Sequence, residues 1–178
     1  MGKDIKFKML RFHGKRLVER IVTLGDNSSM TQPSTLKTFL WFSDGLQEAL
    51  IFYKETFGNH MRVAAENLVS PELFTADFAI YGHEFIGMNT PGGDLFNNSI
   101  SLSIQVDGQE ETDRLWDAIT TNGAPGRCGW CTDKWGVSWQ VTPLQMRDYV
   151  GHPDGEKAEQ NWGILRGMTK IQLSDFVN

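Results

Sequence analysis

The chain has 178 residues, 40% of them hydrophobic and 22% charged, a composition typical of one globular domain with its own core. The net charge of −5 argues against a nucleic-acid-binding surface, and no apolar run approaches the roughly 18–20 residues that span a bilayer. Two cysteines are too few for a disulfide scaffold, and no apolar signal segment follows the first lysines, so we expect a cytoplasmic protein.

The N-terminal part of the chain differs from the rest in charge. Residues 1–29 hold seven Lys and Arg against three Asp and Glu, whereas residues 30–178 hold ten against nineteen. The run IKFKMLRF, followed by HG and KRLVERIVTL, alternates in a way that favours a β-hairpin. We therefore predict an extension over residues 1–30, with Met30 as an alternative natural start, and a single domain over residues 31–178.

A strand followed by a helix opens the predicted domain. The run TLKTFLWF at 35–42 is apolar and aromatic and is bounded by turn residues, which predicts a β-strand. Asp44, with Gln47 three residues later, predicts a side-chain cap at the start of the helix, and Gly58 predicts its end. Five apolar residues recur with helical spacing and predict the buried face: Leu46, Ala49, Leu50, Tyr53 and Phe57.

Three more strands complete this first module. They are predicted at residues 60–67, 73–82 and 84–90. A tight turn at Gly82 and His83 is predicted between the second and the third of them.

The same order of elements returns later in the chain. The run SISLSIQV at 99–106 alternates strictly between polar and apolar residues, which predicts a half-buried strand. Asp107 and Glu110 predict a second capped helix, which we expect to end at Gly123. Its apolar face comprises Leu115, Trp116 and Ile119.

The segments GRCGWC and VSWQVTP, joined by the turn TDKWG, complete a shortened second module. We thus predict two modules with the order strand, helix and three strands, at about 35–90 and 99–143. Helices are expected within 144–172, and the second of these is predicted to carry an apolar stripe of Ala158, Trp162, Leu165 and Thr169.

Paired modules of this kind resemble the vicinal-oxygen-chelate superfamily, also known as the glyoxalase, bleomycin-resistance and dioxygenase fold. Three segments resemble its PhnB-like subfamily, the 3-demethylubiquinone-9 3-methyltransferase domain: FLWFSDGLQEALIFYKETFG, FNNSISLSIQVDGQEETDRLWDAI and GRCGWCTDKWGVSWQVTP. The resemblance implies an α+β fold in which paired βαβββ modules form a cupped mixed sheet, and it implies a homodimer. It covers the chain from about Thr35 to the C-terminal helix.

The methyltransferase description of that subfamily does not fit the sequence. Typical S-adenosylmethionine enzymes bind the cofactor on a glycine-rich loop after the first strand of a doubly wound sheet. No such loop follows a strand here, and the pair Gly92 and Gly93 falls in the linker between the modules. We expect no cofactor.

The superfamily's metal ligands also have no equivalents. The resemblance places Thr38, Ser101 and Gln140 where metal-dependent members carry two histidines and a glutamate. Two hydroxyls and an amide are poor ligands for a divalent transition ion. The four histidines fall in the extension or in loops: His13, His60, His83 and His152. We therefore predict no metal site.

The pair Cys128 and Cys131 has the spacing C-x-x-C but lacks the context of a reactive motif. A structural zinc site needs two further ligands, and a thioredoxin-type motif needs a helix N-terminus. We expect strand cysteines on opposite faces with no redox or metal role. A reactive Cys128 inside the pocket is the alternative.

A ligand pocket is predicted in the concavity of the sheet. The polar residues of the strand at 99–106 cannot face the helices, because the apolar ones do. With aromatic residues at the rim, such a concavity suits a small organic molecule, and Arg127 could meet an anionic group. The predicted pocket residues are Thr38, Leu40, Phe42, Ser101, Ser103, Gln105, Trp130 and Gln140.

Three classes of function stay open at this point. The first is a metal-free protein that binds a small molecule, and the second is a metal-dependent lyase, isomerase or dioxygenase of the same superfamily. The third is a dimeric scaffold without a ligand. Glu66, Asp77 and Glu84 are the candidate general bases on the first module's strands. The sequence does not decide whether the protein is an enzyme.

Overall fold

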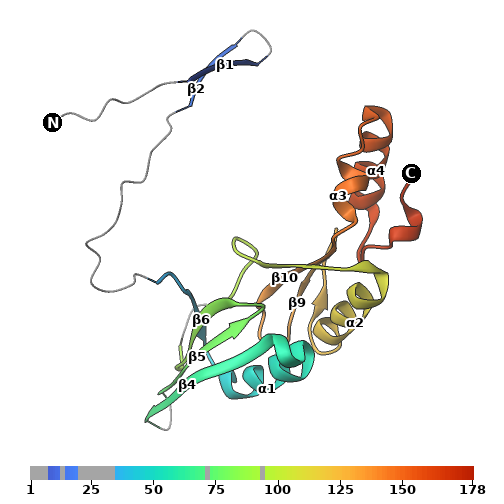
Figure 1. Ribbon diagram of the computed structural model, residues 1–178. Helices are drawn as coiled ribbons and strands as arrows, with labels where there is room; N and C mark the ends of the chain where they lie inside the picture. Colours follow the sequence, from blue (N-terminus) through green and yellow to red (C-terminus); the bar gives the residue numbers. More distant parts are fainter. Residues whose placement is uncertain (1–7, 13–14, 20–34, 71–72, 93–94) are drawn as a thin grey trace, which may run out of the picture. The chain divides into compact units, whose positions relative to one another are not determined.

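The computed structural model describes residues 8–12, 15–19, 35–70, 73–92 and 95–178 (Figure 1). The chain forms two compact units, Met1–Thr35 and Leu36–Asn178. In the first unit, β1 (Lys8–Phe12) pairs antiparallel with β2 (Lys15–Glu19). The proposed start at Met30 and the turn that contains His13 lie outside the described residues, and the domain boundary at residue 30 stays a prediction.

The second unit contains the two modules and the C-terminal helices. The elements of the first module are β3 (Thr38–Phe42), α1 (Leu46–Phe57), the 3-10 turn η1 (Gly58–His60), β4 (Met61–Ser70), β5 (Leu73–Ile80) and β6 (His83–Asn89). Those of the second are β7 (Leu102–Val106), α2 (Gly108–Thr120), β8 (Ala124–Pro125), β9 (Trp130–Thr132) and β10 (Ser138–Pro143). They are followed by α3 (Met146–Val150), α4 (Gly155–Gly167) and η2 (Leu173–Asp175).

The two modules share one sheet topology, which confirms the predicted duplication. The strand orders are β3-β6-β5-β4 and β7-β10-β9-β8, so that in each sheet the first strand lies beside the fourth. That pair is parallel in both modules, and the remaining pairs are antiparallel. The fold is therefore α+β, with two mixed four-stranded sheets in which β3 and β7 are edge strands.

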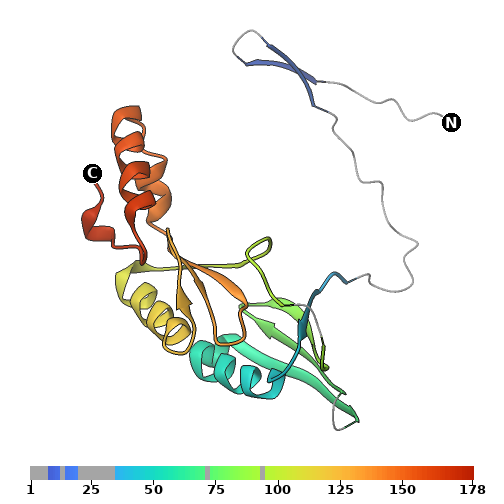
Figure 2. The same cartoon turned by 180° about the vertical axis from the view of Figure 1, so that it is seen from behind.

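The helices α1 and α2 cover the same side of the two sheets (Figures 1 and 2). One hydrophobic core joins both modules, and its most buried side chains include Leu46, Tyr53, Leu115 and Trp139. All five residues that were predicted for the buried face of α1 are buried. A second cluster lies where α3, α4 and the C-terminal tail meet: Met146, Leu165, Ile171 and Phe176.

The predicted side-chain caps of α1 and α2 are wrong. The N-cap of α1 is Gly45, and the first helical amide, Leu46 N, donates to Asn89 Oδ1 at the end of β6 (3.1 Å). Asp107 is the N-cap of α2, but Gly108 N donates to Gln145 Oε1 after β10 (3.1 Å). Each helix start is thus capped from the end of its own module's fourth strand, which a local sequence pattern does not reveal.

Smaller differences concern turns and helix faces. The turn between β5 and β6 is formed by Tyr81 and Gly82, which both have positive φ (48° and 81°), rather than by Gly82 and His83. The helix α2 ends at Thr120, ahead of the expected Gly123. On α4 the predicted stripe is only partly correct, because Leu165 is buried whereas Trp162 is 47% exposed.

Candidate functional site

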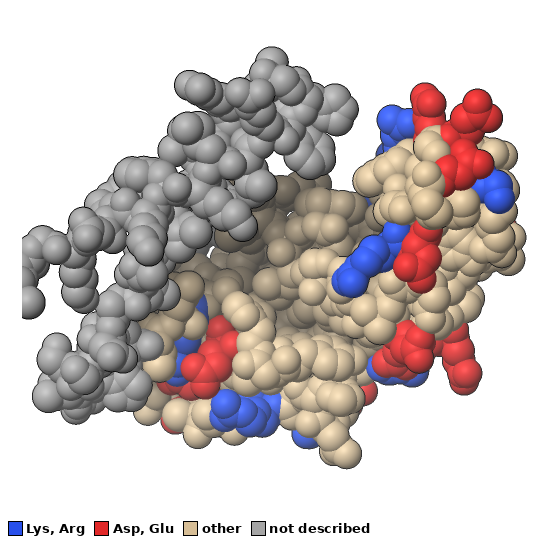
Figure 3. Space-filling model, turned by 45° about the horizontal axis from the view of Figure 1, so that its top comes forward, with Lys and Arg blue, Asp and Glu red and all other residues tan. Residues whose placement is uncertain are grey.

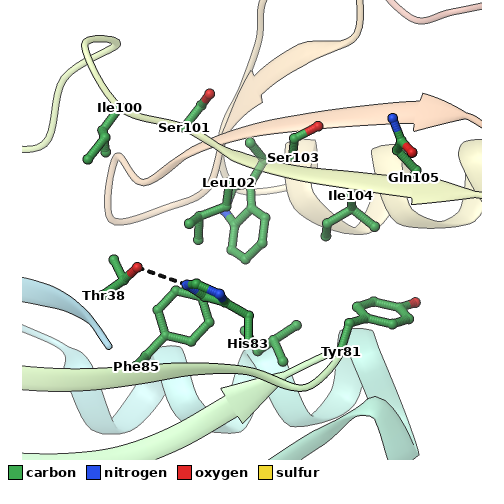
Figure 4. Close-up of a pocket in the computed structure, with 12 residues that line it drawn as sticks. Thr38, Tyr81, His83, Phe85, Ile100, Ser101, Leu102, Ser103, Ile104 and Gln105 are labelled. Carbon is green, nitrogen blue, oxygen red and sulfur yellow. Dashed lines mark hydrogen bonds between the residues drawn. The ribbon is translucent and has the colours of Figure 1, made fainter. Parts of the chain in front are cut away.

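A cavity of about 490 Å³ lies between β7 and the hairpin of β5 and β6 (Figure 4). Its walls are mainly apolar, and Leu102 and Ile104 point from β7 toward Phe85 on the opposite wall. Trp139 of β10, which is 1% exposed, also lines it. Such a volume is in the range of small-molecule pockets.

Three of the residues that bring polar groups to this cavity belong to the first module: Thr38, Tyr81 and His83. Thr38 Oγ1 and His83 Nε2 are 2.8 Å apart and hydrogen-bonded (Figure 4). His83 also packs edge-on against Phe85, with ring centroids 4.7 Å apart. Burial, assisted by the carboxylate of Glu111, raises the pKa of Tyr81 above its ordinary value. Like any tyrosine, it is protonated at neutral pH and can donate a hydrogen bond.

The polar residues of β7 follow the face that points away from the helices. Ser103 pairs with Gln140 of β10 and Gln105 pairs with Thr142, while the apolar partners of these strands face the core. Ser101, Ser103 and Gln105 line the cavity along the strand, but their side chains point away from Phe85 and His83 (Figure 4). The hollow on the face seen in Figure 3 is lined by residues other than Lys, Arg, Asp and Glu, and the charged residues in view lie outside it.

Two of the predicted pocket residues lie in the core instead. Leu40 is 3% exposed and Phe42 is 1% exposed, and both belong to the main hydrophobic cluster beneath α1. The opposite face of β3 carries Phe39 and Trp41, which are 52% and 45% exposed. Leu40 and Phe42 share the face of β3 that carries Thr38, but along the strand this face passes from the cavity into the core, so only Thr38 lines the cavity.

Trp130 and Gln140 lie on neighbouring strands but outside the first cavity. They pair across β9 and β10, and Trp130 lines a second cavity, of about 500 Å³, beside the turn between β8 and β9. Gln140 Nε2 donates to Ser101 Oγ (2.7 Å). Four of the eight predicted pocket residues thus line one cavity: Thr38, Ser101 just before β7, and Ser103 and Gln105 of β7.

The three positions that correspond to superfamily metal ligands do not fit a metal. Ser101 and Gln140 are hydrogen-bonded to each other, whereas Thr38 is bonded to His83. Neutral hydroxyl and amide groups offer no charge to a divalent transition ion. Among the described residues, no three His, Cys, Asp or Glu side chains are grouped so that they could hold one.

The candidate general bases of the first module lie at the surface. Asp77 accepts from Lys37 Nζ (2.7 Å), and Glu84 accepts from Arg62 (3.3 Å). Glu66 belongs to the exposed strand β4. None of the three lines the cavity beside β7.

A buried carboxylate that the sequence did not indicate lies at the junction of the modules. Asp133 is 3% exposed, and its Oδ2 accepts from Tyr53 Oη of α1 (2.7 Å) and from Trp139 Nε1 (3.0 Å). Its Oδ1 accepts from the backbone amides of Trp135 and Val137, each at 3.0 Å. Asp133 therefore holds α1, the turn before β10 and a wall of the cavity together.

The two cysteines occupy different environments. Both are free thiols; Cys131 is buried on the core face of β9, and Cys128 is half-buried in a turn with φ 56°. The expectation that both lie in an extended strand is wrong for Cys128. Burial, followed by the charge of Asp133, raises the pKa of Cys131 to about 12.

We expect this difference to appear in thiol labelling. At about pH 8 the thiolate is the reactive species, so Ellman's reagent should modify Cys128 in the folded protein and reach Cys131 only after unfolding. Absorbance during labelling, with and without urea, measures both rates. The variant Cys128→Ser should show no fast labelling, and equal rates for the two thiols in the native protein would contradict the prediction.

The sequence matches, over residues 34–142, the family described as 3-demethylubiquinone-9 3-methyltransferase. A solved structure of a PhnB protein from Bacillus cereus, described by the same activity, is 25% identical, covers 62% of this chain and 100% of its own, and has a TM-score of 0.55. A protein from Pseudomonas aeruginosa is 21% identical, covers 62% of this chain and 98% of its own, and has a TM-score of 0.52. A fosfomycin resistance protein, FosX from Listeria monocytogenes, is 16% identical, covers 63% of this chain and 95% of its own, and has a TM-score of 0.43. No curated protein matches the sequence.

Proposed function

This chain belongs to the 3-demethylubiquinone-9 3-methyltransferase domain family, the PhnB-like group of the vicinal-oxygen-chelate superfamily, and from this premise we propose that it binds a small organic molecule without a metal. The binding site is the cavity of about 490 Å³ beside β7. The observation that carries the proposal is its make-up: apolar walls with one hydrogen-bonded polar pair, Thr38 and His83. Such a site favours a largely apolar ligand with one hydrogen-bonding group.

The proposal does not extend to methyl transfer. The family's description names that activity, but typical S-adenosylmethionine enzymes bind the cofactor at a glycine-rich loop that follows the first strand of a doubly wound parallel sheet. The described sheets are mixed and four-stranded, and Gly92 precedes the second module rather than a cofactor-binding helix. These features support a binding protein over a methyltransferase.

Binding is tested by filling the cavity. Ile100 lines it at one end and is 68% exposed, so the variant Ile100→Trp should fold while placing a large ring in the opening (Figure 4). We expect a fluorescence titration with the neutral apolar dye N-phenyl-1-naphthylamine to show at least about tenfold weaker binding, because the dye loses buried apolar contacts.

The matched control is Leu68→Trp on β4, a residue of similar exposure (70%) that lines no described cavity. It should bind the dye as the wild-type protein does. Equal weakening in both variants, or none in either, would refute this site. A thermal-shift screen with quinones and aromatic antibiotics would then narrow the ligand class.

The metal-dependent enzyme remains the competing proposal. Elemental analysis of the purified protein separates the two, because the proposed binding protein should contain Mn, Fe, Zn and Ni well below one ion per chain. A stoichiometric transition ion would favour a lyase, isomerase or dioxygenase. The neutral groups at Thr38, Ser101 and Gln140 support the metal-free alternative.

We propose further that the protein is a cytoplasmic homodimer. Exposed aromatic side chains support an apolar contact between copies; Trp41 on β3 is 45% exposed and Trp162 on α4 is 47% exposed. Sedimentation equilibrium measures the mass in solution, and a monomer at micromolar concentration would overturn this part.

The structure also bears on membrane insertion. Within the described residues no helix has the length and apolarity required to cross a membrane.

A further inference from the structure

The second cavity, of about 500 Å³, lies beside the turn that joins β8 and β9, and the proposed function makes no use of it. Its lining combines a cation, an indole and small polar groups from Arg127, Trp130, Asn98 and Thr132. It shares no lining residue with the cavity beside β7.

The backbone at Arg127 is held in a tight turn beside this cavity, and the Arg127 side chain is exposed there. Trp130 N donates to Arg127 O (2.9 Å), which closes a turn whose central residues, Cys128 and Gly129, both have positive φ (56° and 81°). Cys128 N and Gly129 N each donate to the segment after α4, at Met168 O and Thr169 O (2.9 Å). A positive φ at a residue with a side chain costs about 1–2 kcal/mol, so the surrounding bonds maintain this conformation.

The charge of Arg127 is uncompensated at the cavity. Within the described part of the chain, its guanidinium has no hydrogen bond or ion pair, although Arg62 and Arg114 are each paired with a glutamate. No Asp or Glu lines the cavity. In a chain of net charge −5, this cavity therefore presents one isolated positive group beside an aromatic wall.

We propose that this cavity binds a small aromatic carboxylate. A guanidinium forms two parallel hydrogen bonds with a carboxylate, and the half-buried indole of Trp130 offers a flat apolar surface for the ligand's ring. The amide of Asn98 and the hydroxyl of Thr132 are further hydrogen-bonding groups. The site is distinct from the cavity of the proposed function, so each can fail without the other.

The test compares 2-naphthoate with the neutral 2-naphthamide by isothermal titration calorimetry on the full chain. We expect 2-naphthoate to bind about 10- to 100-fold more tightly, because loss of a charge-assisted hydrogen bond has this effect. Arg127→Gln should remove the difference between the two compounds. The matched control Arg166→Gln, on the exposed side of α4, should retain it.

Two further measurements show whether 2-naphthoate binds at the cavity beside Arg127 or elsewhere. Saturating 2-naphthoate should slow the labelling of Cys128 by iodoacetamide, because this thiol lines the same cavity. Ile100→Trp, which fills the cavity beside β7, should leave 2-naphthoate binding unchanged. The proposal is overturned if 2-naphthoate does not bind, if the amide binds equally well, or if Arg127→Gln behaves as the wild-type protein.

Discussion

Replacement of Asp133 by alanine should reduce the free energy of unfolding by about 3–5 kcal/mol, because it leaves buried donors without an acceptor. Tyr53 Oη, Trp139 Nε1 and two backbone amides all donate to this carboxylate, and both aromatic side chains are at most 1% exposed. Urea denaturation followed by tryptophan fluorescence measures the loss. The exposed Asp148→Ala on α3 is the control and should change stability by less than about 0.5 kcal/mol.

The variant Asp133→Asn keeps the shape of the side chain and removes its negative charge, so it measures the contribution of the charge. The amide oxygen can still accept from the backbone amides of Trp135 and Val137, but the NH₂ group faces the indole donor of Trp139. We expect Asp133→Asn to reduce the free energy of unfolding by about 1–3 kcal/mol, less than Asp133→Ala does. A variant as stable as the wild-type protein would show that the network does not join the modules.

Comparison of the wild-type protein with Asp133→Asn should also show how the carboxyl group of Asp133 makes the free energy of unfolding depend on pH. Burial raises the pKa of Asp133 above its ordinary value of 3.8, although hydrogen bonds from Trp139, Tyr53 and two backbone amides act in the opposite direction. The folded state then binds this proton more tightly than the unfolded state, so the associated stability is fully present below pH 3.8 and is lost as pH rises through the folded-state pKa. The free energy of unfolding of the wild-type protein minus that of Asp133→Asn should therefore fall as pH rises. A difference that grows with pH would contradict this sign.

Substitution of Gly129 by alanine should reduce the free energy of unfolding by about 2–5 kcal/mol, the second large effect that we expect. The φ of 81° disfavours any L side chain, and an added Cβ would lie 2.8 Å from Ile171 Cδ1 and 2.9 Å from the carbonyl oxygen of Val141. Because Gly129 N also donates to Thr169 O, the strain should loosen the C-terminal segment. Urea denaturation measures the loss, and hydrogen exchange at Ile171 should report the loosening.

The matched control is Gly163→Ala in the middle of α4. There an added Cβ meets nothing within 4 Å, and alanine has the better helix propensity. We expect Gly163→Ala to increase the free energy of unfolding by about 0.5–1 kcal/mol. If both alanine variants changed stability in the same direction, the conformation of the turn at Gly129 would not be the cause.

Periodicity located the elements of this fold. The helical spacing from Leu46 to Phe57 and the strict alternation of β7 each specify one buried face, and the topology bears out the repeat of strand, helix and three strands. On β3 the alternation fails as a guide, because Phe39 and Trp41 are as apolar as the buried Leu40 and Phe42. Leu40 and Phe42 share a face with Thr38, so the alternation could not show which of the three line the cavity and which lie in the core.

The sequence alone thus determined the two modules, their order and the family to which they belong, because these depend on local spacing and on motifs within single segments. The tertiary structure decided which side chains meet. Asn89 and Gln145 cap helices that are distant in the chain, and Asp133 gathers donors from α1 and β10. Such contacts join residues tens of positions apart, and burial of a single carboxylate has no periodicity by which a sequence could indicate it.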